Sequence, residues 1–152
     1  MVNKHLRYYL ISFLLLLSVN GNIFGQLLVD NFEYSGQLNT NGWDVHSGTT
    51  NFISTTTGLS YTGYAGSGVG NAALVSNLGG EDVNKGFAEQ NVDGSSVYFS
   101  ALVNINDAAS TKSGDYFLHI GDRVSGTSFT SFSARVFAKI TSDVVNFGIS
   151  NT

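Results

Sequence analysis

Apolar and polar residues alternate along several segments of the chain, which is the pattern of β-strands that bury one face. After residue 25, no window shows the 3.6-residue repeat of an amphipathic helix. The pattern therefore predicts an all-β fold. The predicted strands are Leu27–Tyr34, Val97–Ile105, Asp115–Ile120, Phe129–Ile140 and Val144–Ser150.

Short polar links join the last four predicted strands, at residues 106–114, 121–128 and 141–143. Links of this length connect antiparallel neighbours, so these strands are expected to form a four-stranded antiparallel meander. The apolar face of such a sheet needs a second layer, and another sheet must supply it because no helix is predicted. The expected architecture is an antiparallel β-sandwich.

The alternation also assigns side chains to the two faces of the predicted strands. The residues expected to point inward are Phe132, Ala134, Val136, Ala138, Ile140, Val145, Phe147 and Ile149. The residues expected on the outward face of the long strand are Ser133, Arg135, Phe137 and Lys139. In the strand before it, Tyr116, Leu118 and Ile120 share one face, and Asp115, Phe117 and His119 share the other.

Residues 37–91 follow a less regular pattern that is rich in glycine and threonine. Two interpretations are open: short strands joined by ordered loops, or a flexible linker. The large apolar side chains spread through the segment favour ordered loops, because solvated linkers lack them. Those side chains are Trp43, Phe52, Ile53, Leu59, Tyr61, Tyr64, Leu74 and Val75.

The N-terminus has the pattern of a secretory signal peptide over residues 1–25. Lys4, His5 and Arg7 form a basic start, and residues 10–19 form an apolar stretch that is too short to span a bilayer comfortably. Small residues place the expected cleavage after Gly21 or Gly25. An uncleaved membrane anchor is the alternative. The pattern predicts a secreted or cell-surface protein whose residues 26–152 form one β domain.

The amino-acid composition argues against several classes of protein and of binding site. The chain has 152 residues, with 7 Lys and Arg against 11 Asp and Glu, so its formal net charge is −4. Clustered basic residues are absent, which argues against a nucleic-acid partner. With 0 cysteines, the chain can form neither disulfides nor thiolate zinc sites, and it lacks the lipid acceptor of a lipoprotein.

Several strings, taken in order, are similar to a recurring domain of exported bacterial proteins. They are DNFEY, NGW, GLSYTGYAGSGVGNAALV, GEDVNKGF, VYFSALVNI, GDYFLHIGD and FSARVFAKI. The sequence resembles a concanavalin A-like (laminin-G-like) jelly roll found in multidomain surface proteins of the type IX secretion lineage. The resemblance implies that residues 26–152 are the N-terminal portion of the domain. It also implies that the jelly roll is incomplete at the C-terminus and that further domains belong to the same polypeptide.

Candidate catalytic residues are few. Retaining glucanases of this superfamily carry a Glu-x-Asp-x-x-Glu strand, which places paired carboxylates on one face. No such string occurs here, and after residue 25 the glutamates are only Glu33, Glu81 and Glu89. The sequence Ala65-Gly66-Ser67-Gly68 lacks the strand-to-helix setting of a nucleophile elbow and is interpreted as a turn. The chain is predicted to be non-catalytic.

A candidate calcium site consists of oxygen-bearing side chains near glycines. Carboxylate and amide oxygens are suitable calcium ligands. The alternative is a solvated acidic turn whose side chains bond the local backbone. The candidate calcium ligands are Asp30, Glu81, Asp82 and Asn84.

A candidate ligand-binding patch lies on the outward face of the predicted meander. Aromatic rings can stack on the apolar face of a sugar, and polar groups can bond its hydroxyls. The alternative is that this face is covered, so that its aromatic residues are core. The candidate residues are Tyr98, Phe117, His119, Arg135, Phe137 and Asn146. The lone tryptophan, Trp43, is expected to be core rather than a ligand platform.

These observations predict an exported non-catalytic module for binding or spacing, with a glycan or a surface protein as its partner. Two alternatives remain open. One is an accessory module of a secreted hydrolase whose catalytic domain lies downstream. The other is a purely structural surface domain.

Overall fold

The computed structural model of the protein describes residues 25–76, 78, 80–110, 114–125, 128–129 and 131–151. The predicted signal peptide lies outside the described residues, apart from Gly25. Within these ranges the fold is almost entirely β, as the alternation predicts, with one short 3-10 helix, η1 (Leu38–Thr40). The strands are β1 (Asp44–Ser47), β2 (Ser54–Thr56), β3 (Ala72–Leu74), β4 (Asp82–Asn84), β5 (Asp115–Ile120), β6 (Arg123–Ser125), β7 (Ser128–Phe129), β8 (Ser133–Thr141) and β9 (Val144–Ser150).

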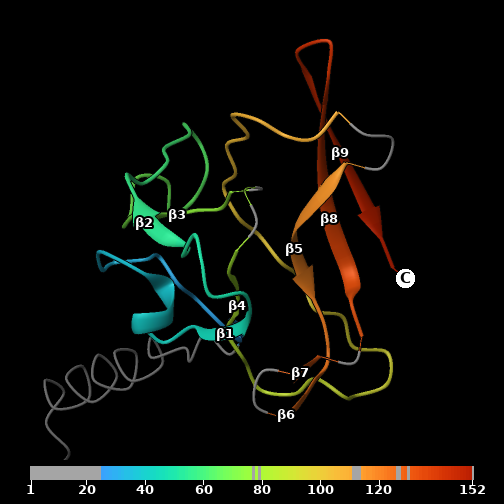
Figure 1. Ribbon diagram of the computed structural model, residues 1–152. Helices are drawn as coiled ribbons and strands as arrows, with labels where there is room; N and C mark the ends of the chain where they lie inside the picture. Colours follow the sequence, from blue (N-terminus) through green and yellow to red (C-terminus); the bar gives the residue numbers. More distant parts are fainter. Residues whose placement is uncertain are drawn as a thin grey trace, which may run out of the picture.

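The strands form four small antiparallel sheets in the described part of the chain. β1 pairs with β4, β2 with β3, and β6 with β7, while β5, β8 and β9 form a three-stranded sheet with β8 in the centre. In Figure 1 the three-stranded sheet stands on one side of the molecule, and the short strands β1 to β4 lie on the other. The sheets are connected by long loops, and all pairings within them are antiparallel.

The hairpin of β8 and β9 is the most regular part of the fold. Seven successive residue pairs join the two strands, from Arg135–Ser150 to Thr141–Val144, without a register shift. The two turn residues, Ser142 and Asp143, have φ values of 50° and 62°. A two-residue turn with both φ angles positive matches the twist of the flanking strands. The predicted strand Val144–Ser150 and its short link are therefore confirmed, as is Asp115–Ile120.

Two predicted strands are wrong. Residues 27–34 and 97–105 are described but form no strand, so the sheet has three strands rather than four. In the first segment, Phe32 has a φ of 52°, and its amide donates to the side chain of Asp30 rather than to a neighbouring strand. The second segment borders one face of the sheet instead of pairing with its edge. The predicted strand Phe129–Ile140 is also divided, because β7 ends at Phe129 and β8 begins at Ser133.

Residues 37–91 contain short strands joined by loops, as the apolar side chains in this segment indicate. Leu38 is the most buried large side chain, with 1% exposure, and its amide donates to the carbonyl of Ile53. The carbonyl of Leu38 accepts from the amides of Asn41 and Trp43, at 2.8 Å and 3.2 Å. The buried Leu38 side chain and these hydrogen bonds hold η1 against the residue that directly precedes β2.

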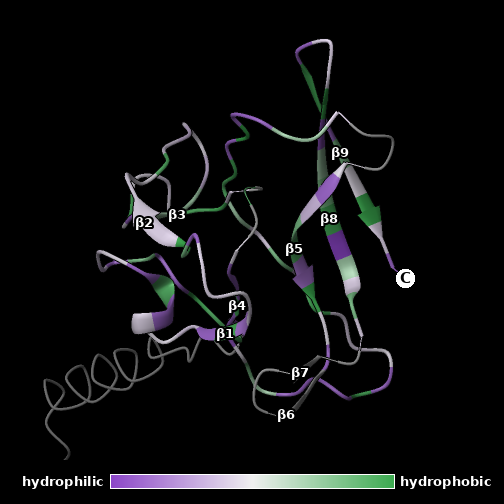
Figure 2. Cartoon of the chain, in the orientation of Figure 1, coloured by the Kyte–Doolittle hydropathy of each residue, from purple (hydrophilic) through white to green (hydrophobic). Residues whose placement is uncertain are grey.

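The inward assignment along β9 is not supported by its burial. Val145, Phe147 and Ile149 are 37%, 60% and 78% exposed. Figure 2 shows that hydrophobic positions continue along this outer strand. Residues of the segment 97–105 border this face beside Phe147, but they leave these side chains exposed. Alternation identified the apolar face of the strand correctly, but the face is open.

Candidate functional site

Two register shifts in the three-stranded sheet decide which side chains share a face. Tyr116 of β5 pairs with Phe137 of β8, but Leu118 pairs with Val136, so β5 carries one extra residue between the two pairs. A bulge of this kind sends the residues on either side of it to opposite faces. Tyr116 therefore shares the face of Phe137, and Phe117 does not.

The face that contains Phe137 combines aromatic rings with a cation. We define the cationic–aromatic face as Tyr116, His119, Arg135 and Phe137. The ring centroids of Tyr116 and Phe137 lie 5.9 Å apart in an edge-to-face arrangement. The guanidinium carbon of Arg135 lies 5.9 Å from the Tyr116 centroid and 5.8 Å from the Phe137 centroid. These distances place Arg135 in cation–π contact with both rings.

His119 forms the end of this face that lies nearest to β1 and β4. Its ring centroid is 5.0 Å from that of Phe132 and 6.2 Å from that of Tyr116. Burial lowers the pKa of His119 below its ordinary value of 6.5, and the neighbouring His46 and Arg135 lower it further, while Asp82 opposes them. The imidazole is therefore largely neutral at pH 7 and can both donate and accept hydrogen bonds.

The structure gathers three of the six predicted ligand-binding residues closely: His119, Arg135 and Phe137. Asn146 lies on the same face, opposite Lys139, and its amide donates to the carbonyl of Val144 at 3.1 Å. Tyr98 is 91% exposed and lies in the segment that borders the other face, so it does not extend the patch.

The prediction that Phe117 lies beside Phe137 is wrong, because the bulge in β5 places Phe117 on the other face of the sheet. Phe117 instead lies 6.4 Å from Phe147, centroid to centroid, on the opposite face. Tyr116, which the alternation assigned to that opposite face, takes its place. The sequence signal that hints at this exchange is the apolar pair Phe117-Leu118, since two adjacent apolar residues in a strand can mark a bulge.

The opposite face of the sheet borders an open apolar groove. Its volume is about 460 Å³. Ser100, the polar member of its lining, lies 2.6 Å from the Tyr64 hydroxyl, which ties residues 97–105 to a distant loop. The groove is lined by Phe99, Ser100, Ala101, Val103, Phe117, Leu118, Val136 and Phe147.

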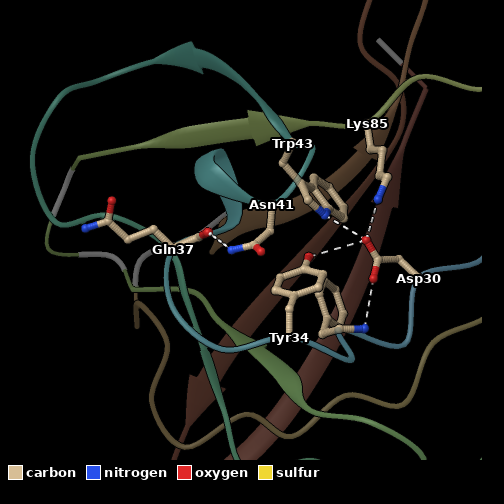
Figure 3. A network of polar contacts seen from close by, with 7 residues as sticks. Asp30, Tyr34, Gln37, Asn41, Trp43 and Lys85 are labelled. Atoms are coloured by element: carbon tan, nitrogen blue, oxygen red, sulfur yellow. Dashed lines mark hydrogen bonds and ion pairs between the residues drawn. The ribbon is translucent and has the colours of Figure 1, made fainter.

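Asp30, a candidate calcium ligand, is the centre of a polar network instead (Figure 3). Its Oδ2 accepts from Lys85 Nζ at 2.7 Å and from Trp43 Nε1 at 2.9 Å, and its Oδ1 accepts from the Phe32 amide at 2.8 Å. The Tyr34 hydroxyl approaches Oδ2 at 3.4 Å. An ammonium group at this distance already neutralises the carboxylate, so the site is poorly suited to a second cation.

The remaining candidate calcium ligands also bond to protein groups. Buried Glu81 accepts from Asn39 Nδ2 at 2.6 Å and from the Ile53 amide at 3.0 Å, while Asp82 accepts from the Ser47 hydroxyl at 2.5 Å. The side-chain amide of Asn84 donates to the Asp44 carbonyl. Over the described ranges, no three His, Cys, Asp or Glu residues form a group that could hold a metal ion. The structure therefore does not bring Asp30, Glu81, Asp82 and Asn84 together into one calcium shell.

Trp43 packs within this network. Its ring is half-buried and stacks on that of Phe32, with centroids 5.9 Å apart and planes 21° from parallel. Lys85 Nζ lies 5.8 Å from its centroid. The indole thus contacts both an aromatic ring and a cation of the protein, which fits the expected packing role better than a ligand platform.

Of the regions described, the cationic–aromatic face offers the most varied chemistry. It presents ring surfaces for stacking, a guanidinium for hydrogen bonds and a neutral imidazole. Asp115, the acidic residue of β5, pairs with Ala138 and so lies on the groove face. The arrangement is suited to holding a polar ligand with apolar patches.

In comparisons with known proteins, the chain matches no family model, no curated protein and no solved structure. A search for membrane spans over the described residues finds no helix with the length and apolar character needed to cross a bilayer.

Proposed function

We propose that the protein is an exported, non-catalytic β-sandwich module that binds carbohydrate at the cell surface through its cationic–aromatic face. The observation that carries this proposal is the mutual contact of Tyr116, Phe137 and Arg135 on one face of the three-stranded sheet. Export and surface location rest on the signal-peptide pattern of residues 1–25. The concanavalin A-like jelly roll rests on the sequence resemblance together with the all-β fold.

The chemistry of the face suits a sugar ring. Aromatic side chains can cover the apolar C–H surface of the ring, and Arg135 and His119 can bond its hydroxyls. On β9 the residue opposite Phe137 is Gly148, which has no side chain to cover the aromatic ring. The register of β8 and β9 is unbroken here, so the strands hold these groups rigidly in place.

A structural spacer is the second candidate. The observation that favours it is the partial burial of Phe137 and Arg135, which could be explained by packing alone. The two candidates make opposite statements about Phe137. In a binding module its loss weakens ligand binding more than folding, whereas in a spacer its loss weakens folding alone.

The test is carbohydrate binding by the purified full chain on a panel of immobilised polysaccharides. In the proposed function, Phe137→Ala weakens binding by about 1–3 kcal/mol, as for losses of base–aromatic stacking in nucleic-acid complexes. The melting temperature should change little. If Phe137 is core, the substitution should instead cost about 3–5 kcal/mol of folding stability.

Two matched variants serve as controls. Phe147→Ala removes the same ring from the groove face, and Tyr98→Ala removes an exposed aromatic ring that lies away from Phe137. Both should bind carbohydrate as well as the unmodified chain. A chain that binds no polysaccharide, or one in which all three variants lose binding equally, would contradict the proposed function and favour a spacer.

A further inference from the structure

The surroundings of Arg135 restrict the chemical class of the ligand more than the aromatic rings do. Its guanidinium carbon lies within 6 Å of two ring centroids, at 5.9 Å and 5.8 Å. Its Nε is buried and has no hydrogen-bond partner within the described ranges. Contact with two rings restricts the orientation of the guanidinium, while its N–H groups can still bond other groups. Such an edge is complementary to a carboxylate, which accepts two parallel hydrogen bonds.

The charges around Arg135 support the same conclusion. Lys139 lies on the same face of β8, four residues further along, and Asp115 lies on the opposite face. His119 is largely neutral at pH 7, and the acidic group that acts on it is Asp82 of β4. After residue 25 the sequence contains five basic residues, and two of them lie on this face of β8. In an acidic chain, this locally basic face favours an anionic ligand.

We propose that the carbohydrate bound at the cationic–aromatic face carries a carboxylate, as the uronic acids do, and that Arg135 donates hydrogen bonds to it. This inference rests on the proposed function, because it names the class of sugar that the same face selects. The sugar ring lies on Phe137, and its carboxylate meets the guanidinium beside that ring. Arg135 then determines the specificity of the site, and Phe137 supplies contact that neutral and acidic sugars share.

The test compares two polymers with the same sugar ring, polygalacturonate and its methyl ester. Both present that ring to Phe137, but the ester is uncharged and cannot form the bidentate ion pair with Arg135 that a carboxylate forms. The full chain should bind polygalacturonate at least about tenfold more tightly than the ester at physiological salt, since two parallel hydrogen bonds between charged groups are stronger than a hydrogen bond to a neutral carbonyl. Arg135→Gln should remove this preference, so that the two polymers bind with about equal affinity. Arg135→Lys, which keeps the charge but not the fork, should retain only part of the preference.

Lys139→Gln is the matched control, because it removes the same charge from the same face. It should reduce the preference far less than Arg135→Gln does. An equal loss in the two variants would mean a non-specific electrostatic attraction and would overturn the inference. Circular dichroism of each variant verifies the fold, and the preference of the unmodified chain tests the inference even if a variant fails to fold.

The other outcomes separate this inference from the proposed function. If both polymers bind equally and Phe137→Ala weakens both, the proposed function stands and the selection of acidic sugars is wrong. If neither these polymers nor any neutral polysaccharide binds, both proposals fail together.

Discussion

Residues 25–110 contain four strands of three or four residues each, whereas β5, β8 and β9 are six to nine residues long. The region with the shorter strands nevertheless contains most of the buried side chains. Among the side chains that are buried in the described ranges, those of Leu38, Glu81 and Asn84 belong to it, and that of Ala138 belongs to the long-stranded sheet. The length and regularity of a strand therefore do not show where burial is concentrated.

The two regions also hold their backbones differently. In the sheet of β5, β8 and β9, backbone pairing along long strands supplies the order, without a register shift between β8 and β9. In residues 25–110, two carboxylates connect segments that are far apart in the sequence. Asp30 accepts hydrogen bonds from Trp43 and Lys85, and Glu81 accepts from Asn39 and Ile53. Carboxylates that accept hydrogen bonds from distant segments can therefore hold irregular loops together without long strands.

The largest effect should come from Leu38, because its side chain is almost fully buried. Leu38→Ala should lower the free energy of unfolding by about 2–5 kcal/mol, the range for removing a buried leucine side chain. Ile149→Ala removes a similar volume from an exposed site and should change it by only about 0.5 kcal/mol or less. Urea unfolding, monitored by circular dichroism, measures the free energy of unfolding of both variants. Equal losses would show that β9 is covered and that the two regions do not differ as described.

A smaller effect should come from Gly70, where the loop approaches the N-terminal segment closely. Its φ is 68°, and a Cβ added to it would lie 1.8 Å from the carbonyl oxygen of Asn31. Gly66 has a comparable φ of 82° with open space around it, so it isolates the cost of the backbone conformation. Gly70→Ala should destabilise the protein by about 1–3 kcal/mol more than Gly66→Ala, since the clash forces the backbone to move. Thermal melts of the two variants compare them, and equal melting temperatures would mean that this contact does not hold the loop.

The smallest effect concerns the pH dependence of the Asp30 network. Burial alone would raise the pKa of Asp30, but hydrogen bonds from Lys85, the Phe32 amide and Trp43, together with the Lys85 charge, hold it below its usual value of 3.8. A carboxyl with a lowered pKa stabilises the folded state above the pKa of the unfolded chain, near pH 4. This stability is lost as the pH falls through the lower folded value.

Asp30→Asn should therefore cost about 1–2 kcal/mol at pH 7, because the Lys85 ammonium loses its charged partner. It should cost progressively less as the pH falls below 4. Urea unfolding at pH 2 to 7 measures this difference in the free energy of unfolding. Lys85→Met, measured in the same series, should likewise make the free energy of unfolding depend less on pH. A variant whose stability differs from that of the unmodified chain by the same amount at every pH would contradict the role assigned to the network.

Local patterning predicted the strands at Asp115–Ile120 and Val144–Ser150 with their observed bounds. These segments alternate clearly and are adjacent to short turns, so local information is sufficient. The segment 97–105 alternates equally well but forms no strand. Alternation shows that a segment is compatible with a β-strand, but a strand also requires a partner for its backbone groups.

The candidate site was predictable only in part, because its members depend on register. His119, Arg135 and Phe137 come together as the alternation indicates, although Ala134, with a φ of 48°, interrupts β8 at one end. The exchange of Phe117 for Tyr116 follows from one extra residue in β5. A shift of one residue moves a side chain to the other face, and no composition rule locates such a shift.

The sequence by itself determined the all-β class, the antiparallel hairpin at the end of the chain and the types of residue available for binding. These properties follow from alternation, turn residues and composition, all of which act over a few neighbouring positions. Tertiary structure decided that Asp30 bonds Lys85 and Trp43, that β9 remains open, and that Tyr116 joins Arg135 and Phe137. Those properties depend on contacts between distant segments and on strand register, which are set when the whole chain packs and its buried polar groups find partners.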